Sequence, residues 1–353
     1  MNIKNVGRIK KQKPLIIPLF IPHAGCPHQC AFCNQKVIAG QKAGKISLKA
    51  VRRQIDQFLT YPSGKRETVQ ISFYGGNFLG LEPESIRALL DEACRFIEKG
   101  KAESIRFSTR PDTISRETLK LISSYPIRTV ELGVQSMDDR VLEQARRGHT
   151  ALDTKNALLL LKETPYDIGL QIMTGLPGDN EASTLLTAQK LAEFSPAFVR
   201  IYPALVLKDS LLARWYETGK FHPLTLDEAI HRVKTLYLFF QERAIPVIRM
   251  GLQASDTLEA DQNVLAGPYH PAFGHLVLSS IYLDKASELL KKNPGLTGTA
   301  TFCVRLQNIS RMRGQNNRNI KILKKRFRLD SIDVIPDDGM AADDIRLAER
   351  EPL

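Results

Sequence analysis

The sequence predicts an α/β fold: an open, partial TIM-type barrel of about six parallel strand units, followed by a small C-terminal α+β extension. Three observations lead to this prediction. Short apolar segments alternate with longer amphipathic ones through the first 250 residues. Strand–helix alternation of this kind implies a parallel sheet with right-handed crossovers, and it repeats six times rather than eight. Residues suited to chemistry follow the strands, which is where barrels of this kind place their active sites.

The apolar, β-rich segments expected to form the six strands are 15–21, 69–74, 105–108, 129–134, 168–174 and 198–202. The helical patterns between and after them cover 47–60, 82–99, 115–123, 151–163, 180–194 and 225–243. Ser47 and Thr225 have the residue types that begin helices, and Glu228 completes a capping-box pattern with Thr225. These ranges predict a barrel core over residues 14–250.

Beyond residue 250 the alternation weakens. We expect a loop rich in glycine and proline at 266–274, then a helix over 275–292, a strand over 299–305, a basic helix over 316–327 and a strand near 332–335. The last dozen residues are expected to fray. The chain therefore divides into a basic N-terminal tail, 1–13, the core, and a C-terminal extension, 251–353, that we expect to pack on the barrel and to contact RNA.

Composition and charge limit the function classes. The chain has 353 residues, 43% of them hydrophobic and 25% charged, as in ordinary soluble globular proteins. No apolar run reaches the ~18 residues that a membrane-spanning helix needs. The apolar segment 14–22 is broken by prolines and lacks a cleavage site, so it is interpreted as a strand and not as a signal peptide. These features favour a cytoplasmic protein with no membrane partner.

The net charge of +12 favours a polyanionic partner. Residues 1–13 carry five Lys/Arg and no acid, and residues 305–330 carry nine Lys/Arg against one acid. The basic C-terminal stretch is a candidate contact for tRNA or other RNA. The alternative is that two exposed, charged ends keep the protein soluble.

Three cysteines form the most informative motif. Cys26, Cys30 and Cys33 have C-x3-C-x2-C spacing in one loop after the first strand. Three thiolates can hold three irons of a 4Fe–4S cluster, whose full protein ligation takes four, and one iron then stays open to a ligand. A structural zinc site with His23 or His28 as fourth ligand is the alternative. An odd number of cysteines in a reducing compartment disfavours a disulfide.

Other polar or glycine-rich residues follow the later strands. Two adjacent glycines, Gly75 and Gly76, let backbone approach a ligand closely. Gln135 ends a buried strand in an amide, and Arg147 carries a guanidinium that can fork onto a carboxylate. The complete set after strands two to six is Gly75-Gly76-Asn77, Ser108-Thr-Arg110-Pro-Asp112, Gln135-Ser136, Gly175-Leu-Pro-Gly-Asp179, and Arg200 with Tyr202.

Taken in order, these motifs resemble the radical S-adenosylmethionine (SAM) half of the Elongator catalytic subunit, within a wider group that includes oxygen-independent coproporphyrinogen oxidase. The likeness runs through Arg147-Gly-His149, Arg200-Ile-Tyr-Pro and Gly267-Pro-Tyr-His-Pro, so it covers most of the chain. It implies one 4Fe–4S cluster held by Cys26, Cys30 and Cys33, with SAM on the open iron. The SAM-binding positions that it implies are Gly75, Gly76, Asn77, Gln135, Arg147 and Gln171.

Two of these positions depart from the group. Asn77 stands where relatives often have Ser or Glu, and Gln171 stands in the place of an aspartate. The acetyltransferase domain of the Elongator subunit has no counterpart within the 353 residues. We therefore expect either a separate acyltransferase to act with this chain or a different substrate.

The function that the resemblance implies is reductive cleavage of SAM to a 5′-deoxyadenosyl radical, which abstracts hydrogen from a substrate. The sequence does not name that substrate, for which tRNA is the candidate, and it assigns no catalytic residue and no oligomeric state. An electron donor of the flavodoxin or ferredoxin type is the expected partner. The alternative function is an RNA- or protein-binding module with a purely structural metal site.

Overall fold

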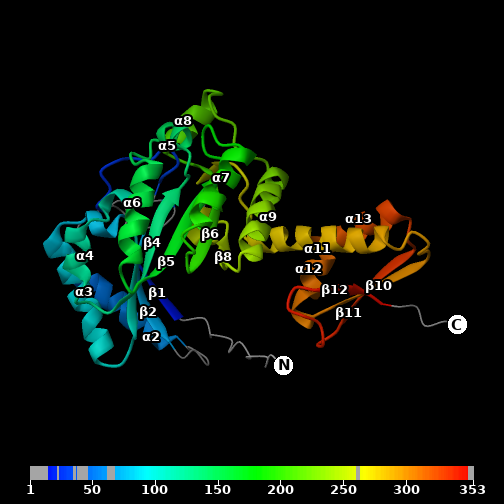
Figure 1. Cartoon of the computed structure of the whole chain (residues 1–353), viewed down its shortest axis with the longest axis horizontal. Coiled ribbons are helices and arrows are strands. Elements are labelled where there is room, and N and C mark those ends of the chain that lie inside the picture. The colour runs from blue at the N-terminus through cyan, green and yellow to red at the C-terminus, as the bar shows by residue number, and fades with distance from the viewer. Residues whose placement is uncertain are drawn as a thin grey trace, which may run out of the picture.

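A half-barrel of parallel strands forms the body of the molecule (Figure 1). The computed structural model describes residues 15–21, 24–34, 37, 47–61, 68–259 and 263–348, so the expected basic tail 1–13 and His23 lie outside the described residues. Within this part, seven strands make one sheet in the order β1-β2-β3-β4-β5-β6-β8, and all neighbours are parallel. Spatial order follows chain order, which confirms the predicted partial barrel.

Each predicted strand is present, and the sheet has one more. The seven strands are β1 (Leu15–Phe20), β2 (Val69–Tyr74), β3 (Ser104–Thr109), β4 (Ile127–Gln135), β5 (Asp167–Thr174), β6 (Phe198–Pro203) and β8 (Val247–Met250). The prediction of six units missed β8. This strand has four residues, an arginine among them, and Ile248 is exposed. Its hydrophobic signal is therefore too short to stand out from the sequence.

Helices connect the strands. Those that the sequence predicted are α2 (Leu48–Thr60), α3 (Pro83–Glu98), α4 (Arg116–Ile122), α6 (Ala151–Lys162), α7 (Glu181–Ala192) and α9 (Leu226–Glu242). The short helices α5 (Asp139–Gln144) and α8 (Leu211–Glu217) were not predicted. The Ser47 hydroxyl caps α2 by accepting from the Ala50 amide, and Thr225 and Glu228 form the predicted capping box at α9. None of the helices in the described ranges is long and apolar enough to cross a membrane.

The two faces of the sheet differ in polarity. Successive side chains of a strand point to opposite faces. In β4, Val130, Leu132 and Val134 are fully buried and belong to one core cluster with apolar residues of the surrounding helices. Glu131 and Gly133 alternate with them and face away from this core. The concave side of the half-barrel is therefore polar, while the convex side is apolar and covered by helices.

The C-terminal extension contains a second small core. It consists of α11 (Phe273–Lys291), β10 (Thr299–Val304), α12 (Ile309–Arg313), α13 (Arg318–Phe327), β11 (Ser331–Pro336) and β12 (Ile345–Leu347). Strand β10 pairs in parallel with β11 and antiparallel with β12. Residues of β12 fall within the last dozen, so the expectation that this whole stretch frays is wrong for 345–347: pairing with β10 orders them.

Helix α11 links this extension to the barrel. Its first residues, Phe273 and Val277, belong to the barrel core, whereas Tyr282 and Leu290 belong to the core of the extension. Figure 1 shows α11 running from beside α9 out to the small sheet, with α13 at its far end. A short helix, α10 (Asp256–Glu259), and a short strand, β9 (Val264–Ala266), come between β8 and α11 in the chain, and β9 pairs with β7 (Val206–Leu207), which follows β6.

Candidate active site

The cysteine loop follows β1 and is held by its neighbours. Cys30 is buried, with 5% of its surface exposed, and Cys26 and Cys33 are half-buried. The Ala31 amide donates to the Ala145 carbonyl at 2.9 Å, and the Ala31 carbonyl accepts from Leu212 at 2.8 Å. The loop is therefore bonded to the α5 end and to α8, which gives these two unpredicted helices a role in positioning the thiols.

The glycine turn after β2 packs directly against this loop. A Cβ at Gly76 would lie 2.4 Å from the Ile21 carbonyl oxygen and 2.7 Å from that of Ala24. A Cβ at Gly25 would lie 2.2 Å from the Asn77 carbonyl oxygen. Only glycine allows two loops to approach this closely. The glycine turn thus lies beside the cysteine loop, where packing between the loops requires glycine at position 76. The predicted contact of Gly75 and Gly76 with SAM stays a prediction.

Asn77 braces three loops at once. It is fully buried, and its Nδ2 donates to the Gly25 carbonyl at 2.8 Å. Its Oδ1 accepts from the Thr109 hydroxyl at 2.7 Å and from the Arg110 amide at 3.0 Å. These bonds join the cysteine loop, the glycine turn and the loop after β3. Its side chain is engaged in bracing, and its predicted contact with SAM stays a prediction.

Two buried arginines lie at the cysteines. Arg147 is 7% exposed; its Nη1 donates to the Cys30 Sγ at 3.3 Å and its Nη2 to the Gly133 carbonyl at 2.5 Å. Arg110 is 2% exposed and forms two bonds to the Asp112 carboxylate. Burial raises the pKa of the Cys26 thiol, and both arginines oppose that rise. The surroundings of the thiols are thus suited to an anionic occupant.

Gln135 and Arg147 meet over Gly133. A Cβ on Gly133 would lie 2.9 Å from the Arg147 Nη2 and 3.0 Å from the Gln135 Nε2. Gln135 has φ +69°, a left-handed conformation that is uncommon for a non-glycine residue and is typical of functional sites. The pairing of β4 with β5 shifts register between Gly133 and Gln135. The bulge aims the amide of Gln135 at the strand ends, beside Arg147.

His149 ends the Arg147-Gly-His149 motif, and no role was predicted for it from the sequence. It is 5% exposed, and its ring is buried next to the backbone of Val134. Burial, followed by the charges of Arg147 and Arg110, lowers the pKa of this imidazole to about 3. The ring is therefore neutral at physiological pH.

A charged network lines the concave face below these loops. The Glu131 carboxylate is fully buried, with Arg106 Nε at 2.7 Å and Arg200 Nε at 3.1 Å. Tyr74 donates to it at 3.1 Å and the Gln171 amide at 3.3 Å. Gln171 is thus brought into this network from β5. Glu131 and Arg106 were not predicted as site residues, although charged residues at alternate positions of otherwise apolar strands are a readable signal.

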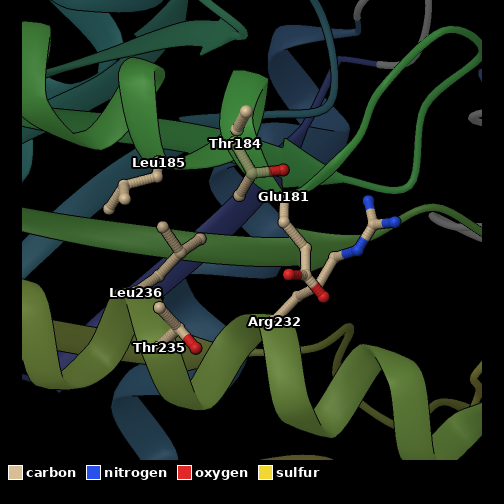
Figure 2. A pocket seen from close by; sticks show the side chains of 7 residues that line it. Glu181, Thr184, Leu185, Arg232, Thr235 and Leu236 are labelled. Atoms are coloured by element: carbon tan, nitrogen blue, oxygen red, sulfur yellow. The ribbon is translucent and has the colours of Figure 1, made fainter.

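One cavity lies apart from the cysteine loop. A cavity of about 280 Å³ opens between α7 and α9 on the helical side of the sheet, and Figure 2 shows its lining side chains. Its walls include Leu185 and Leu236, with Glu181 and Arg232 at one end. Arg232 also reaches Asp179 of the turn after β5, at 3.5 Å. None of its lining residues comes from the cysteine loop, so we assign it no part in the site.

The donor set at the strand ends fits an iron–sulfur cluster. Three thiols lie in one braced loop, and the buried Arg147 donates to the sulfur of Cys30. In the described part of the chain, no three His, Cys, Asp or Glu side chains converge on a position for a single metal ion. A cubane cluster does not require the thiols to converge on one point, because each thiolate binds its own iron.

The fold and the site define a class: half-barrel enzymes of the TIM type that place a three-cysteine loop after the first strand. Residues 20–191 match the model of the radical SAM superfamily, and residues 196–282 match that of the Radical_SAM C-terminal domain. The chain belongs to the radical SAM superfamily of enzymes, as the resemblance predicted.

Three relatives show how the chain compares. An uncharacterised protein of Methanocaldococcus jannaschii is 27% identical, over 83% of this chain and 89% of its own length. A tRNA uridine(34) acetyltransferase of Dehalococcoides mccartyi is 26% identical over 56% of this chain. The chain spans about half of that relative's length, 50%. The structure of archaeal Elp3 from Methanocaldococcus infernus, with an N-terminal deletion, is similar with a TM-score of 0.58 at 21% identity, covering 77% of this chain and 63% of that one.

Proposed function

We propose that Cys26, Cys30 and Cys33 hold one 4Fe–4S cluster and that SAM binds beside it at the ends of β2, β4 and β5. The observation that carries this proposal is the braced cysteine loop, with the Arg147 guanidinium 3.3 Å from the Cys30 sulfur. Two buried arginines that each keep one donor unpaired, Arg147 at Nε and Arg110 at Nη1, support the proposal, because a solely structural loop has no need of them.

The residues around the site have separate tasks in this proposal. When bound and reduced, the cluster and SAM supply a 5′-deoxyadenosyl radical for hydrogen abstraction. The backbone of Gly75 and Gly76 binds the amino group of SAM, and Gln135 and Arg147 orient its polar atoms. Asn77 holds the three loops in register. Gln171 extends the SAM site toward the concave face, where Glu131 fixes its amide.

Anaerobic reconstitution tests this function. We expect about four irons per chain, a reducible cluster signal, and 5′-deoxyadenosine when dithionite and SAM are added. Cys30→Ala should lose all three. Cys94→Ala, on α3, is the matched control and should lose none. A chain that binds zinc and releases no 5′-deoxyadenosine would instead support the alternative, a binding module with a structural metal.

We further propose that the substrate is RNA and that the chain works in the cytoplasm with a flavodoxin or ferredoxin-type donor. One relative is named as a tRNA uridine(34) acetyltransferase, and the extension of this chain carries a basic surface on α13. Arg318 is paired with Asp227, and Arg326 donates to Ser287. Among the nine cations of residues 305–330, five have no side-chain partner in the described part of the chain: Arg313, Lys321, Lys324, Lys325 and Arg328.

Salt-dependent binding tests the RNA proposal. Phosphate contacts by Lys and Arg release counterions, so affinity falls steeply with salt, and removing one phosphate-binding cation lowers that slope by about one. The test variant neutralises Lys321, Lys324 and Lys325 to Gln; its control neutralises the exposed cations Lys49, Arg53 and Lys99 to Gln. We expect tRNA affinity and slope to fall only in the first. Equal affinity in both would contradict the proposal.

A further inference from the structure

Arg110 has features that the proposed cofactor contacts leave unexplained. It is among the largest fully buried side chains of the protein, at 2% exposure, yet it lies in the loop after β3 and not in the apolar core. Its Nε and Nη2 donate to the two Asp112 oxygens at 2.9 and 2.8 Å. Its Nη1 is buried and has no hydrogen-bond partner among the described residues.

Burial gives this ion pair an inner and an outer end. The side chain of Arg110 is 2% exposed and that of Asp112 is 22% exposed, so the carboxylate lies on the solvent side and the guanidinium on the inner side. The Asn77 side chain joins this loop to the cysteine loop, because its Oδ1 accepts from the Arg110 amide and its Nδ2 donates to the carbonyl of Gly25, the residue before Cys26. The edge of the guanidinium that Asp112 leaves free, at Nη1, is buried as well.

The ion pair also has a fixed orientation. A bidentate bond to a carboxylate holds the plane of a guanidinium and leaves its remaining edge pointing one way. The backbone of Arg110 is fixed as well, since its amide donates to the Asn77 Oδ1 at 3.0 Å. Asn77 is the residue that joins this loop to the cysteine loop. Arg110 is thus held in place from both its main chain and its side chain.

We propose that Arg110, oriented by Asp112, is a second fixed cation of the cluster site, beside Arg147, and that it raises the reduction potential of the cluster. This inference rests on the proposed function. Reduction adds one electron from an external donor and hence one negative charge to the cluster. A nearby cation stabilises the reduced form more than the oxidised form, and charges and hydrogen bonds near the sulfurs are known determinants of cluster potential.

The measurement is the midpoint potential of the reconstituted holoprotein, from a redox titration followed by electron paramagnetic resonance without SAM. At the wild-type midpoint, we expect Arg110→Met to lower the ratio of reduced to oxidised cluster by roughly tenfold, which corresponds to about 59 mV for one electron. Arg110→Lys should keep most of the wild-type ratio. The matched control is Arg140→Met, because Arg140 also pairs with an aspartate two residues away, Asp138, but is 75% exposed.

A variant of opposite sign separates electrostatics from structural damage. Asp112→Asn removes the negative charge that partly offsets Arg110. The midpoint potential of the cluster in this variant should therefore lie above that of the wild type. If Arg110→Met fails to take up a cluster, Arg110→Lys and Asp112→Asn decide the matter. Equal potentials in the wild type and Asp112→Asn, or in the wild type and Arg110→Met, would overturn the inference while the proposed function stands. Absence of a cluster from the wild type would overturn the proposed function itself.

Discussion

Replacing Glu131 by Gln should destabilise the folded protein strongly. The substitution keeps the shape of the side chain and removes its charge. Two arginines then lose their only carboxylate partner among the described residues: Arg106, whose side chain is 7% exposed, and Arg200, at 15%. Burial by itself lowers the pKa of Arg200, and in the wild type Glu131 more than reverses this. Arginine side chains do not lose their proton in proteins, so deprotonation offers no escape from the cost of an unpaired buried charge.

The magnitude follows from these exposures. Removing one partner of a buried pair typically costs about 3–5 kcal/mol, because an uncompensated charge is left behind. Glu92 gives a matched comparison: it is itself 3% exposed, but its partners Arg52 and Arg95 are 50% and 60% exposed and can turn to water. For Glu92→Gln we expect ~1 kcal/mol or less.

Guanidinium unfolding of the apoprotein, followed by circular dichroism, measures both changes in the free energy of unfolding. A double-mutant cycle adds Arg106→Met. In the wild type this substitution removes a favourable pair, while in Glu131→Gln it removes an unpaired charge, so it should cost less there. If Glu131→Gln lowers the free energy of unfolding no more than Glu92→Gln does, then the charges on the concave face are not buried from water and balanced against one another as we infer.

Three further predictions concern the strand-end loops. Gly76→Ala should prevent cluster uptake and lower the melting temperature, since its Cβ would lie 2.4 Å from a carbonyl oxygen, whereas Gly295→Ala, with open space around it, should change neither. Asn77→Ala should destabilise by about 2–6 kcal/mol in unfolding experiments, because the Arg110 amide and the Gly25 carbonyl each lose a buried partner at ~1–3 kcal/mol; a loss under 1 kcal/mol would contradict the bracing role. The pKa of His149 falls from 6.5 in the unfolded chain to about 3 in the folded protein, so the unfolded state binds more protons between these values and stability declines as pH drops from 6.5 toward 3. His149→Phe should lower the slope of the free energy of unfolding against pH by up to ~1.4 kcal/mol per pH unit in this range. An unchanged slope in unfolding experiments would refute the burial of a neutral imidazole at this position.

The sequence predicted the barrel well because each core strand carries a full apolar row. β2, β4 and β5 have buried residues at every second position, so their hydrophobic pattern stands out. β8 and β12 have four and three residues, and pairing with β6 and β10 forms them rather than their own composition. Local pattern cannot report an interaction whose partner lies tens of residues away.

The sequence indicated which residues belong to the candidate site, but not what each side chain contacts there. The spacing of the cysteines identified their loop, and Gln135 and Arg147 do meet over Gly133. The sequence could not show that the Asn77 amide is engaged between loops, since its partners come from three separate segments. The spacing of Arg110 and Asp112 is visible in the sequence. That Arg110 is buried, in a loop that Asn77 joins to the cysteine loop, depends on the fold.

The helix α11 sets a distance within the molecule. Its 19 residues span about 28 Å, at 1.5 Å each, and its two ends belong to different cores. The rigid helix α11 would therefore fix the distance between the barrel and a nucleic acid bound to α13. Adding four residues to the middle of α11 would nearly preserve the rotation of the extension and shift it by about 6 Å, the step of roughly one or two nucleotides along a strand. The choice of substrate would then depend on the length of α11 as well as on the charge of α13.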